Sequence, residues 1–133
     1  MPPTRPRAAP SRVARLAALP LVVLTFAAGC GGGEPVLDAT AQKGKQRATE
    51  LACMSCHTVD GSRSEGPTWK GLHGSTVGLK DGRTVTADDA YLARSITDPR
   101  ADVVQGALGP MPVVQSLQPG DVEPIVAYIR SLK

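Results

Sequence analysis

The chain has 133 residues, enough for one domain, and its 15 basic and 12 acidic residues give a formal net charge of +3. Four of the arginines precede Cys30, whereas all of the acidic residues follow it. From Cys30 onward, 11 basic residues face 12 acidic residues, which leaves a net charge of −1. The positive charge is therefore no argument for nucleic-acid binding, and we expect no nucleic-acid partner.

The first 29 residues predict a secretory signal peptide. The four arginines form a positive region, residues 16–26 form an apolar run, and the small residues 27–29 follow. The apolar run is too short to span a bilayer comfortably. We therefore expect residues 1–29 to be a signal peptide of the lipoprotein type, and the protein to be exported.

Cys30 is the predicted lipid attachment site. Residues 25–30 resemble a bacterial lipobox, in which the cysteine becomes a lipidated N-terminus, although Ala27 replaces the leucine common there. Ordinary cleavage at an Ala-x-Ala-like site and an uncleaved anchor stay open as alternatives. We expect a flexible tether over 30–38 and an anchor on the periplasmic or outer face of the cell membrane.

Cys53-Met54-Ser55-Cys56-His57 has the C-x-x-C-H pattern of a c-type haem attachment site. The two thiols add to the two vinyl groups of the porphyrin, and His57 is then placed to bind the iron. A zinc site would need a second Cys/His pair and a thioredoxin-like pair a strand–helix–strand context, and the sequence has neither. A buried porphyrin would also supply apolar area to a chain with only 3% aromatic residues.

The segments around this motif predict short helices and one hairpin. A helix is expected from N-cap Asp38 to Leu51, with Gly44 indicating the close approach of a second helix. Residues 66–74 form a turn series with Trp69 and Leu72 as apolar anchors. Residues 78–85 predict a hairpin with a two-residue type I′ turn at Asp81-Gly82.

Two further helices are expected in the C-terminal half. The first begins with Thr86 as N-cap, has Leu92 and Ile96 on one face, and ends at Asp98-Pro99. The last helix has an apolar face, but its start is ambiguous. Pro119 could be the first helical residue after Gln118, or the helix could start at Pro124 with Glu123 at the cap.

Met111 is the predicted second iron ligand. Pro110 and Pro112 restrict the backbone on both sides of it, which lowers the entropy cost of presenting the sulfur. His73 is the competitor, and its alternative role is that of a turn histidine near the haem edge. His57 and Met111 together predict a coordinatively closed iron with a fairly positive potential, which passes electrons but binds no substrate.

From about Ala39 to Lys133 the chain resembles the class I cytochrome c family. The matching segments are Cys53–His57, Gly66-Pro67, Gly71-Leu72, Asp98-Pro99, Gly109–Pro112 and Ala127–Ile129. The resemblance implies a small all-α single-haem cytochrome c fold over 39–133, with three to five short helices wrapped around the haem and a small β-hairpin insertion. Residues 79–92 and 95–99 resemble, more closely, the cytochrome c domain fused to subunit II of some bacterial haem–copper oxidases.

The resemblance also implies roles for individual residues. The Pro67 carbonyl would accept a hydrogen bond from His57, and Trp69 and Leu72 would line the haem pocket. The first helix would cross the last one near Gly44, opposite Tyr128. In addition, Ser95 stands about where some relatives place a tyrosine near the methionine sulfur.

These observations predict a one-electron carrier of a bacterial respiratory chain and not an enzyme. The expected partners are a terminal oxidase, a quinol-oxidising complex or a dehydrogenase, and the carrier is expected to be monomeric. A haem c subunit of a larger oxidase or dehydrogenase complex is the main alternative. A haem peroxidase would need an open iron site and a distal acid–base group, and a sensor would need an output domain.

Overall fold

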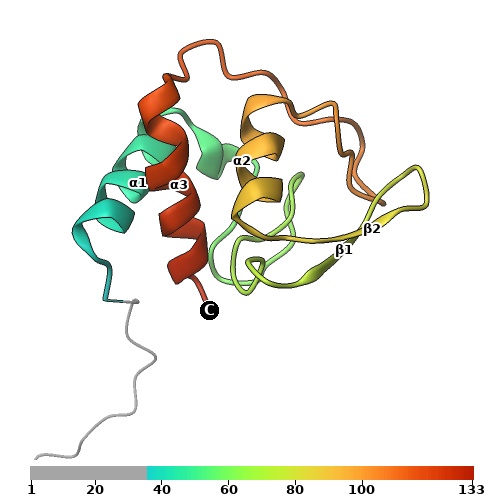
Figure 1. Ribbon diagram of the computed structural model, residues 1–133, viewed down its shortest axis with the longest axis horizontal. Coiled ribbons are helices and arrows are strands. Elements are labelled where there is room, and N and C mark those ends of the chain that lie inside the picture. Colours follow the sequence, from blue (N-terminus) through green and yellow to red (C-terminus); the bar gives the residue numbers. More distant parts are fainter. Residues whose placement is uncertain (1–35) are drawn as a thin grey trace, which may run out of the picture. The chain divides into compact units, whose positions relative to one another are not determined.

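The computed structural model describes residues 36–133, so the predicted signal peptide, Cys30 and most of the tether lie outside the described residues. The elements in chain order are α1 (Ala39–Glu50), η1 (Cys53–Ser55), β1 (Thr76–Gly78), β2 (Thr84–Thr86), α2 (Asp89–Thr97) and α3 (Pro119–Ser131) (Figure 1). Within residues 36–133, three α-helices and one small sheet match the predicted all-α fold with a hairpin insertion. No helix in this range is long and apolar enough to cross a membrane.

The first and last helices cross each other (Figure 1), and their backbones are in contact at the crossing. Asp38 caps α1 as expected, since its carboxylate accepts a hydrogen bond from Ala41 N at 2.8 Å. A Cβ atom on Gly44 would overlap the Pro124 carbonyl group and would lie 3.0 Å from Ile125 N. The predicted close approach at Gly44 is therefore confirmed. Its centre lies at Pro124, one turn before the Tyr128 that we expected opposite it.

Helix α3 begins at Pro119, which decides between the two predicted starts. Gln118 is the N-cap, and its N–H donates to the Asp121 carboxylate at 2.9 Å. Pro124 lies inside the helix, where it lacks the N–H that would bond one turn back. The side of α3 that carries Pro124 packs on α1, so tertiary contact accompanies the lost helical hydrogen bond.

The hairpin differs from the prediction in its turn. Thr76, Val77 and Gly78 pair with Thr86, Val85 and Thr84. Leu79 N donates to Arg83 O at 2.8 Å, and Gly82 N donates to Leu79 O at 3.1 Å. A type I′ turn requires positive φ at both Asp81 and Gly82, but only Gly82 has it, at +87°. The connection is thus a three-residue loop with a left-handed glycine at its end, and the type I′ prediction was wrong.

Helix α2 starts two residues later than predicted. Its N-cap is Asp88, whose carboxylate accepts from Tyr91 N at 2.8 Å. Thr86, the predicted cap, instead ends β2 and pairs with Thr76. Both residues are good caps, and the hairpin ladder decides between them. The helix ends at Thr97 with Asp98 as its C-cap, as the Asp98-Pro99 pair predicted.

The core lies between α3 and the segments that face it. Ile125 and Ile129 are the largest fully buried side chains, at 1% and 2% exposure. Trp69, Leu79 and Leu92 join them from the turn series, the hairpin and α2. One side of this core borders a cavity.

Candidate haem site

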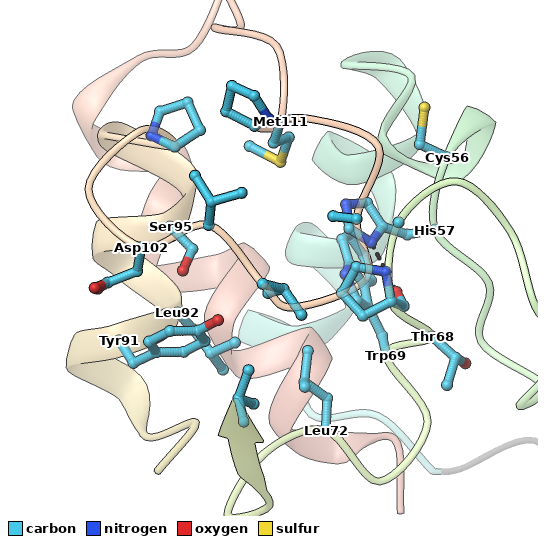
Figure 2. Close-up of a pocket in the computed structure, with 18 of the residues that line it drawn as sticks. Cys56, His57, Thr68, Trp69, Leu72, Tyr91, Leu92, Ser95, Asp102 and Met111 are labelled. Atoms are coloured by element: carbon cyan, nitrogen blue, oxygen red, sulfur yellow. Dashed lines mark hydrogen bonds between the residues drawn. The ribbon is translucent and has the colours of Figure 1, made fainter. Parts of the chain in front are cut away.

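A cavity of about 670 Å³ lies beside α2 and α3. Its walls come from the segment after the C-x-x-C-H motif, the hairpin, α2 and the segment between α2 and α3 (Figure 2). A smaller cavity of about 190 Å³ shares His57, Trp69 and Met111 with it and adds Cys53. The larger volume lies within the roughly 300–1,000 Å³ typical of cofactor and ligand sites.

One ring nitrogen of His57 makes a hydrogen bond, and the other is available to bind a metal. Its Nδ1 lies 2.8 Å from the Pro67 carbonyl oxygen, the contact that the resemblance implied. Because a carbonyl only accepts, the proton sits on Nδ1 and leaves Nε2 with a free lone pair. Burial lowers the pKa of His57, against the opposing effect of the Pro67 hydrogen bond. The neutral form thus favoured is the one that binds metals.

Packing fixes the plane of the His57 ring. A Cβ on Gly66 would lie 2.6 Å from His57 Cε1, so only glycine leaves room for the ring here. On another side Trp69 stacks on the imidazole, with centroids 5.1 Å apart and planes at 27°. Trp69 in turn meets Tyr128 of α3 edge-to-face at 6.1 Å. The imidazole is therefore connected to the last helix through Trp69, by two successive aromatic contacts.

The two motif cysteines are free thiols that border the cavities. Cys53 and Cys56 occupy a short 3₁₀ turn, and His57 N donates to Cys53 O at 3.1 Å. Ala52, just before the turn, has a left-handed backbone with φ of 56°, which redirects the chain out of α1. Both thiols and His57 thus project from one compact turn.

Met111 reaches the same space from a distant segment. It is half-buried in the segment 103–118, called here the Met111 segment, and it lines both cavities. Figure 2 shows its side chain and the His57 ring facing the same space. His73 lines neither cavity, and its Nε2 instead lies 3.0 Å from Asp89 Oδ1. The structure therefore places Met111 with His57 and leaves His73 outside the cavity walls.

The other predicted pocket residues also line the cavity. Pro67, Trp69 and Leu72 are all in its wall. Met54, which lies inside the motif, packs against the core cluster and is not among the lining residues.

Helix α2 supplies four wall residues, of which only Ser95 had been placed near the site, by the resemblance. Tyr91, Leu92 and Ser95 face the cavity (Figure 2), and Ile96 also lines it. Leu92 and Ile96 were predicted only as an apolar helix face, and widening that face to include the residue before each of them would have found Tyr91 and Ser95. Within residues 36–133, the Ser95 hydroxyl is the buried side-chain oxygen or nitrogen that has no hydrogen-bond partner.

Asp102 is a further wall residue that the sequence did not indicate. Its side chain is buried and bonds Arg83 at 2.9 Å and Arg94 at 2.6 Å. Hydrogen bonds from Arg94, followed by those from Arg83, lower the pKa of Asp102. This cluster ties the hairpin, α2 and the segment after α2 together at the edge of the cavity.

The donor set fits an iron porphyrin. An imidazole with a free Nε2, a thioether and two thiols border the two cavities, and imidazole and thioether are ligands of haem iron in electron-transfer proteins. Within residues 36–133, no group of three or more His, Cys, Asp or Glu side chains is placed to hold a bare metal ion.

Two comparisons with known proteins found matches. The sequence profile of the cytochrome c family matches residues 41–133. Among 45 matching chains of solved structure is cytochrome cH from Methylobacterium extorquens, which is 27% identical. The match covers 68% of this chain and 96% of that one, with a TM-score of 0.51. No curated protein matches the chain.

Proposed function

Because the chain belongs to the cytochrome c family, we propose that it is a one-electron carrier of a bacterial respiratory chain, with His57 and Met111 as axial ligands. Family membership means that the protein carries one covalently bound haem c and transfers electrons rather than catalysing a reaction. The finer proposal concerns the ligands, the membrane tether and the partners. The observation that carries it is that His57 and Met111, 54 positions apart, line the same cavity.

The haem, when bound, supplies an iron that alternates between Fe(III) and Fe(II). The protein has three tasks around it. Cys53 and Cys56 hold the porphyrin through thioether bonds, His57 offers Nε2 in an orientation fixed by Pro67, and Met111 offers a neutral sulfur. If His57 and Met111 both hold the iron, they would leave it no open position for an exogenous ligand.

The cavity lining supports a fairly positive potential. A neutral thioether stabilises Fe(II) relative to a second imidazole. The apolar walls from Leu72, Leu92 and Ile96 lower the local dielectric and disfavour the additional positive charge of the ferric state. Both effects favour the reduced form, which suits a carrier that donates to a terminal oxidase.

Membrane tethering rests on the sequence before the described residues. Lipidation of Cys30, followed by the tether over 30–38, would hold the haem domain at the periplasmic or outer face of the cell membrane. A tether raises the local concentration of membrane-bound partners, such as a terminal oxidase, a quinol-oxidising complex or a dehydrogenase. Mass spectrometry of the N-terminal peptide tests this part, and an unmodified Cys30 would contradict it.

The axial ligands are tested by spectra of Met111→Ala beside Met54→Ala. Both variants remove one methionine, but only Met111 lines the cavity. We expect ferrous Met111→Ala to bind carbon monoxide and to have a lower reduction potential, whereas wild type and Met54→Ala bind none. Carbon monoxide binding by the wild type would contradict closed ligation and would favour a peroxidase or gas sensor.

A further inference from the structure

The Met111 segment is held at its two ends but not in its middle. At the first end, backbone hydrogen bonds of 2.8 and 2.9 Å join Val103 and Gln105 to the hairpin, and at the other end Gln118 caps α3. Among the described residues, those at 108–113 form no backbone–backbone hydrogen bond. The place of Met111 in the site therefore depends on how firmly the two ends are fastened.

Asp102 lies directly before the first end and is bound by two arginines from different elements. Arg83 of the hairpin binds Oδ1 at 2.9 Å, and Arg94 of α2 binds Oδ2 through Nε at 2.7 Å and through Nη2 at 2.6 Å. The Asp102 side chain is only 4% exposed, and the residue lines the larger cavity. Hydrogen bonds between charged partners are roughly twice as strong as neutral ones, so we expect Asp102 to hold this end more firmly than the backbone does.

Neutralising Asp102 would loosen this end without burying a bare charge. The side chains of Arg83 and Arg94 are 55% and 45% exposed, so water can solvate both guanidinium groups when their shared partner loses its charge. Asparagine has nearly the size of aspartate and fills the same space. Asp102→Asn therefore weakens the anchor while the packing of the core stays the same.

We propose that Asp102, bound by Arg83 and Arg94, is a positioning residue that keeps Met111 on the haem iron. The inference rests on the proposed function, since it takes Met111 as an iron ligand. It adds that this cluster of three side chains and the bond from Met111 to the iron open together as one unit. The strength of the cluster then decides how often the sixth coordination position is free.

Local opening of this kind fits the sparse packing of the Met111 segment. Parts of a protein with few buried contacts open without global unfolding, and none of residues 103–118 is fully buried. An external ligand enters only while Met111 is off the iron, so its binding rate is proportional to the fraction of molecules that are open. If this opening also breaks the contacts of Asp102, a weaker cluster raises that fraction.

Two variants separate this local effect from loss of charge and from loss of global stability. Asp89 also binds two side chains, Arg130 at 2.6 Å and His73 at 3.0 Å, but it is 52% exposed and lines neither cavity. Asp89→Asn is therefore the matched control for the lost carboxylate. Gly44→Ala, which strains the crossing of α1 with α3, is the control for global stability.

The test is the binding of cyanide to the ferric, haem-loaded protein at neutral pH, followed by stopped-flow spectroscopy. We expect Asp102→Asn to bind cyanide at least about tenfold faster than wild type, because charge-assisted contacts no longer oppose opening. Arg83→Gln, which leaves Arg94 in place, should bind at least about threefold faster. Asp89→Asn and Gly44→Ala should stay within about twofold of wild type.

The absorption band that arises from sulfur bound to ferric iron gives a second readout. On warming, this band disappears when Met111 leaves the iron, whereas circular dichroism reports unfolding of the domain. We expect the gap between the two transition temperatures to widen in Asp102→Asn, because only the local opening becomes easier. In Gly44→Ala the gap should narrow, because only the global transition moves down.

Equal cyanide rates in Asp102→Asn and wild type would overturn the inference, even if the melting temperature fell, and would leave Met111 as the ligand. Equal acceleration in Asp89→Asn or Gly44→Ala would overturn it as well, since the effect would then not be local. If Asp102→Asn does not accumulate with haem, Arg83→Gln decides by the same criterion. A wild type that binds cyanide as fast as Met111→Ala would show that Met111 does not hold the iron, and both the ligand assignment and this inference would fail.

Discussion

The crossing of α1 with α3 and the Met111 segment differ in what holds them in place. At the crossing, the Gly44 backbone lies against Pro124, and the Arg47 guanidinium binds the buried Asp121 carboxylate through two hydrogen bonds of 2.8 Å. The Met111 segment has no fully buried residue, and its backbone is fixed to the hairpin at Val103 and Gln105. Contacts within the chain thus hold the crossing in place, whereas the Met111 segment depends on the cofactor for its core.

This contrast explains why the helices could be predicted in more detail than the site. Local signals were sufficient at Asp38 and at Asp98-Pro99, where a cap or a proline fixes one helix end. They failed where two local solutions compete and a long-range contact decides. Thr86 pairs with Thr76 in the hairpin and therefore does not cap α2. The start of α3 at Pro119 goes together with the packing of this helix on α1.

The residues of the site also fall into those that a sequence signal predicted and those that only a long-range contact brings together. His57, Met111 and the pocket residues Trp69 and Leu72 were found because each belongs to a motif with its own chemistry or to the family resemblance. Asp102 was missed, since its partners Arg83 and Arg94 lie 19 and 8 residues away and no spacing rule joins them. The ion pair between Arg47 and Asp121, which are 74 residues apart, could not be predicted from the sequence either.

The largest expected effect comes from removing the haem. In Cys53→Ser/Cys56→Ser purified without haem, we expect no cooperative thermal unfolding, measured by circular dichroism. At about 24 cal/mol per Å³, leaving the cavity of about 670 Å³ unfilled costs up to about 16 kcal/mol, an upper bound because water enters an open cavity. That exceeds the roughly 5–15 kcal/mol of a typical domain. Cys30→Ser, a change outside the domain, is the control, and a cooperative transition in the double variant would refute the idea of a cofactor-built core.

The crossing is tested by adding one methyl group. Gly44→Ala should lower the free energy of unfolding by about 3 kcal/mol, because the new Cβ overlaps the Pro124 backbone, which cannot rotate away. Gly120→Ala is the matched control in α3, where a Cβ meets nothing within 4 Å. It should change stability by less than about 1 kcal/mol, in the stabilising direction. Equal effects in chemical denaturation would show that the crossing is not backbone-limited.

Acid should weaken the crossing through Asp121. Hydrogen bonds from Arg47, followed by that from Gln118 N, lower the pKa of Asp121 to about 2. A carboxyl group with a depressed folded-state pKa stabilises the fold above its unfolded pKa of about 3.9, and this contribution disappears as the pH falls towards 2.

The measurement is the difference in unfolding free energy between wild type and Asp121→Asn. It should be constant above about pH 5 and should shrink between about pH 4 and pH 2. Glu123→Gln, an exposed change on the same helix, also removes one negative charge and is the control for that loss of charge. A difference for Asp121→Asn that is independent of pH would contradict the role of its ion pair.

The smallest expected effect is at the cavity wall. Ser95 has a buried hydroxyl with no partner within residues 36–133, whereas the Ser131 hydroxyl donates to Tyr128 O at 2.6 Å. Ser95→Ala should leave the unfolding free energy unchanged or raise it by up to about 1 kcal/mol, and Ser131→Ala should lower it by about 1 kcal/mol. A clear loss of stability in Ser95→Ala would show that the hydroxyl has a partner in the haem-bound protein.

The contact between Gly44 and Pro124 also constrains when the domain can fold. The two residues are 80 positions apart, so α1 emerges from the ribosome, and from any export channel, long before the helix it packs against. Until α3 has been made, Ala41 and Ala48 of α1 have no partner surface from it. The domain can therefore complete its fold only after α3 has been made, and a truncation that removes Ile129 and Leu132 would leave the first helix unsupported.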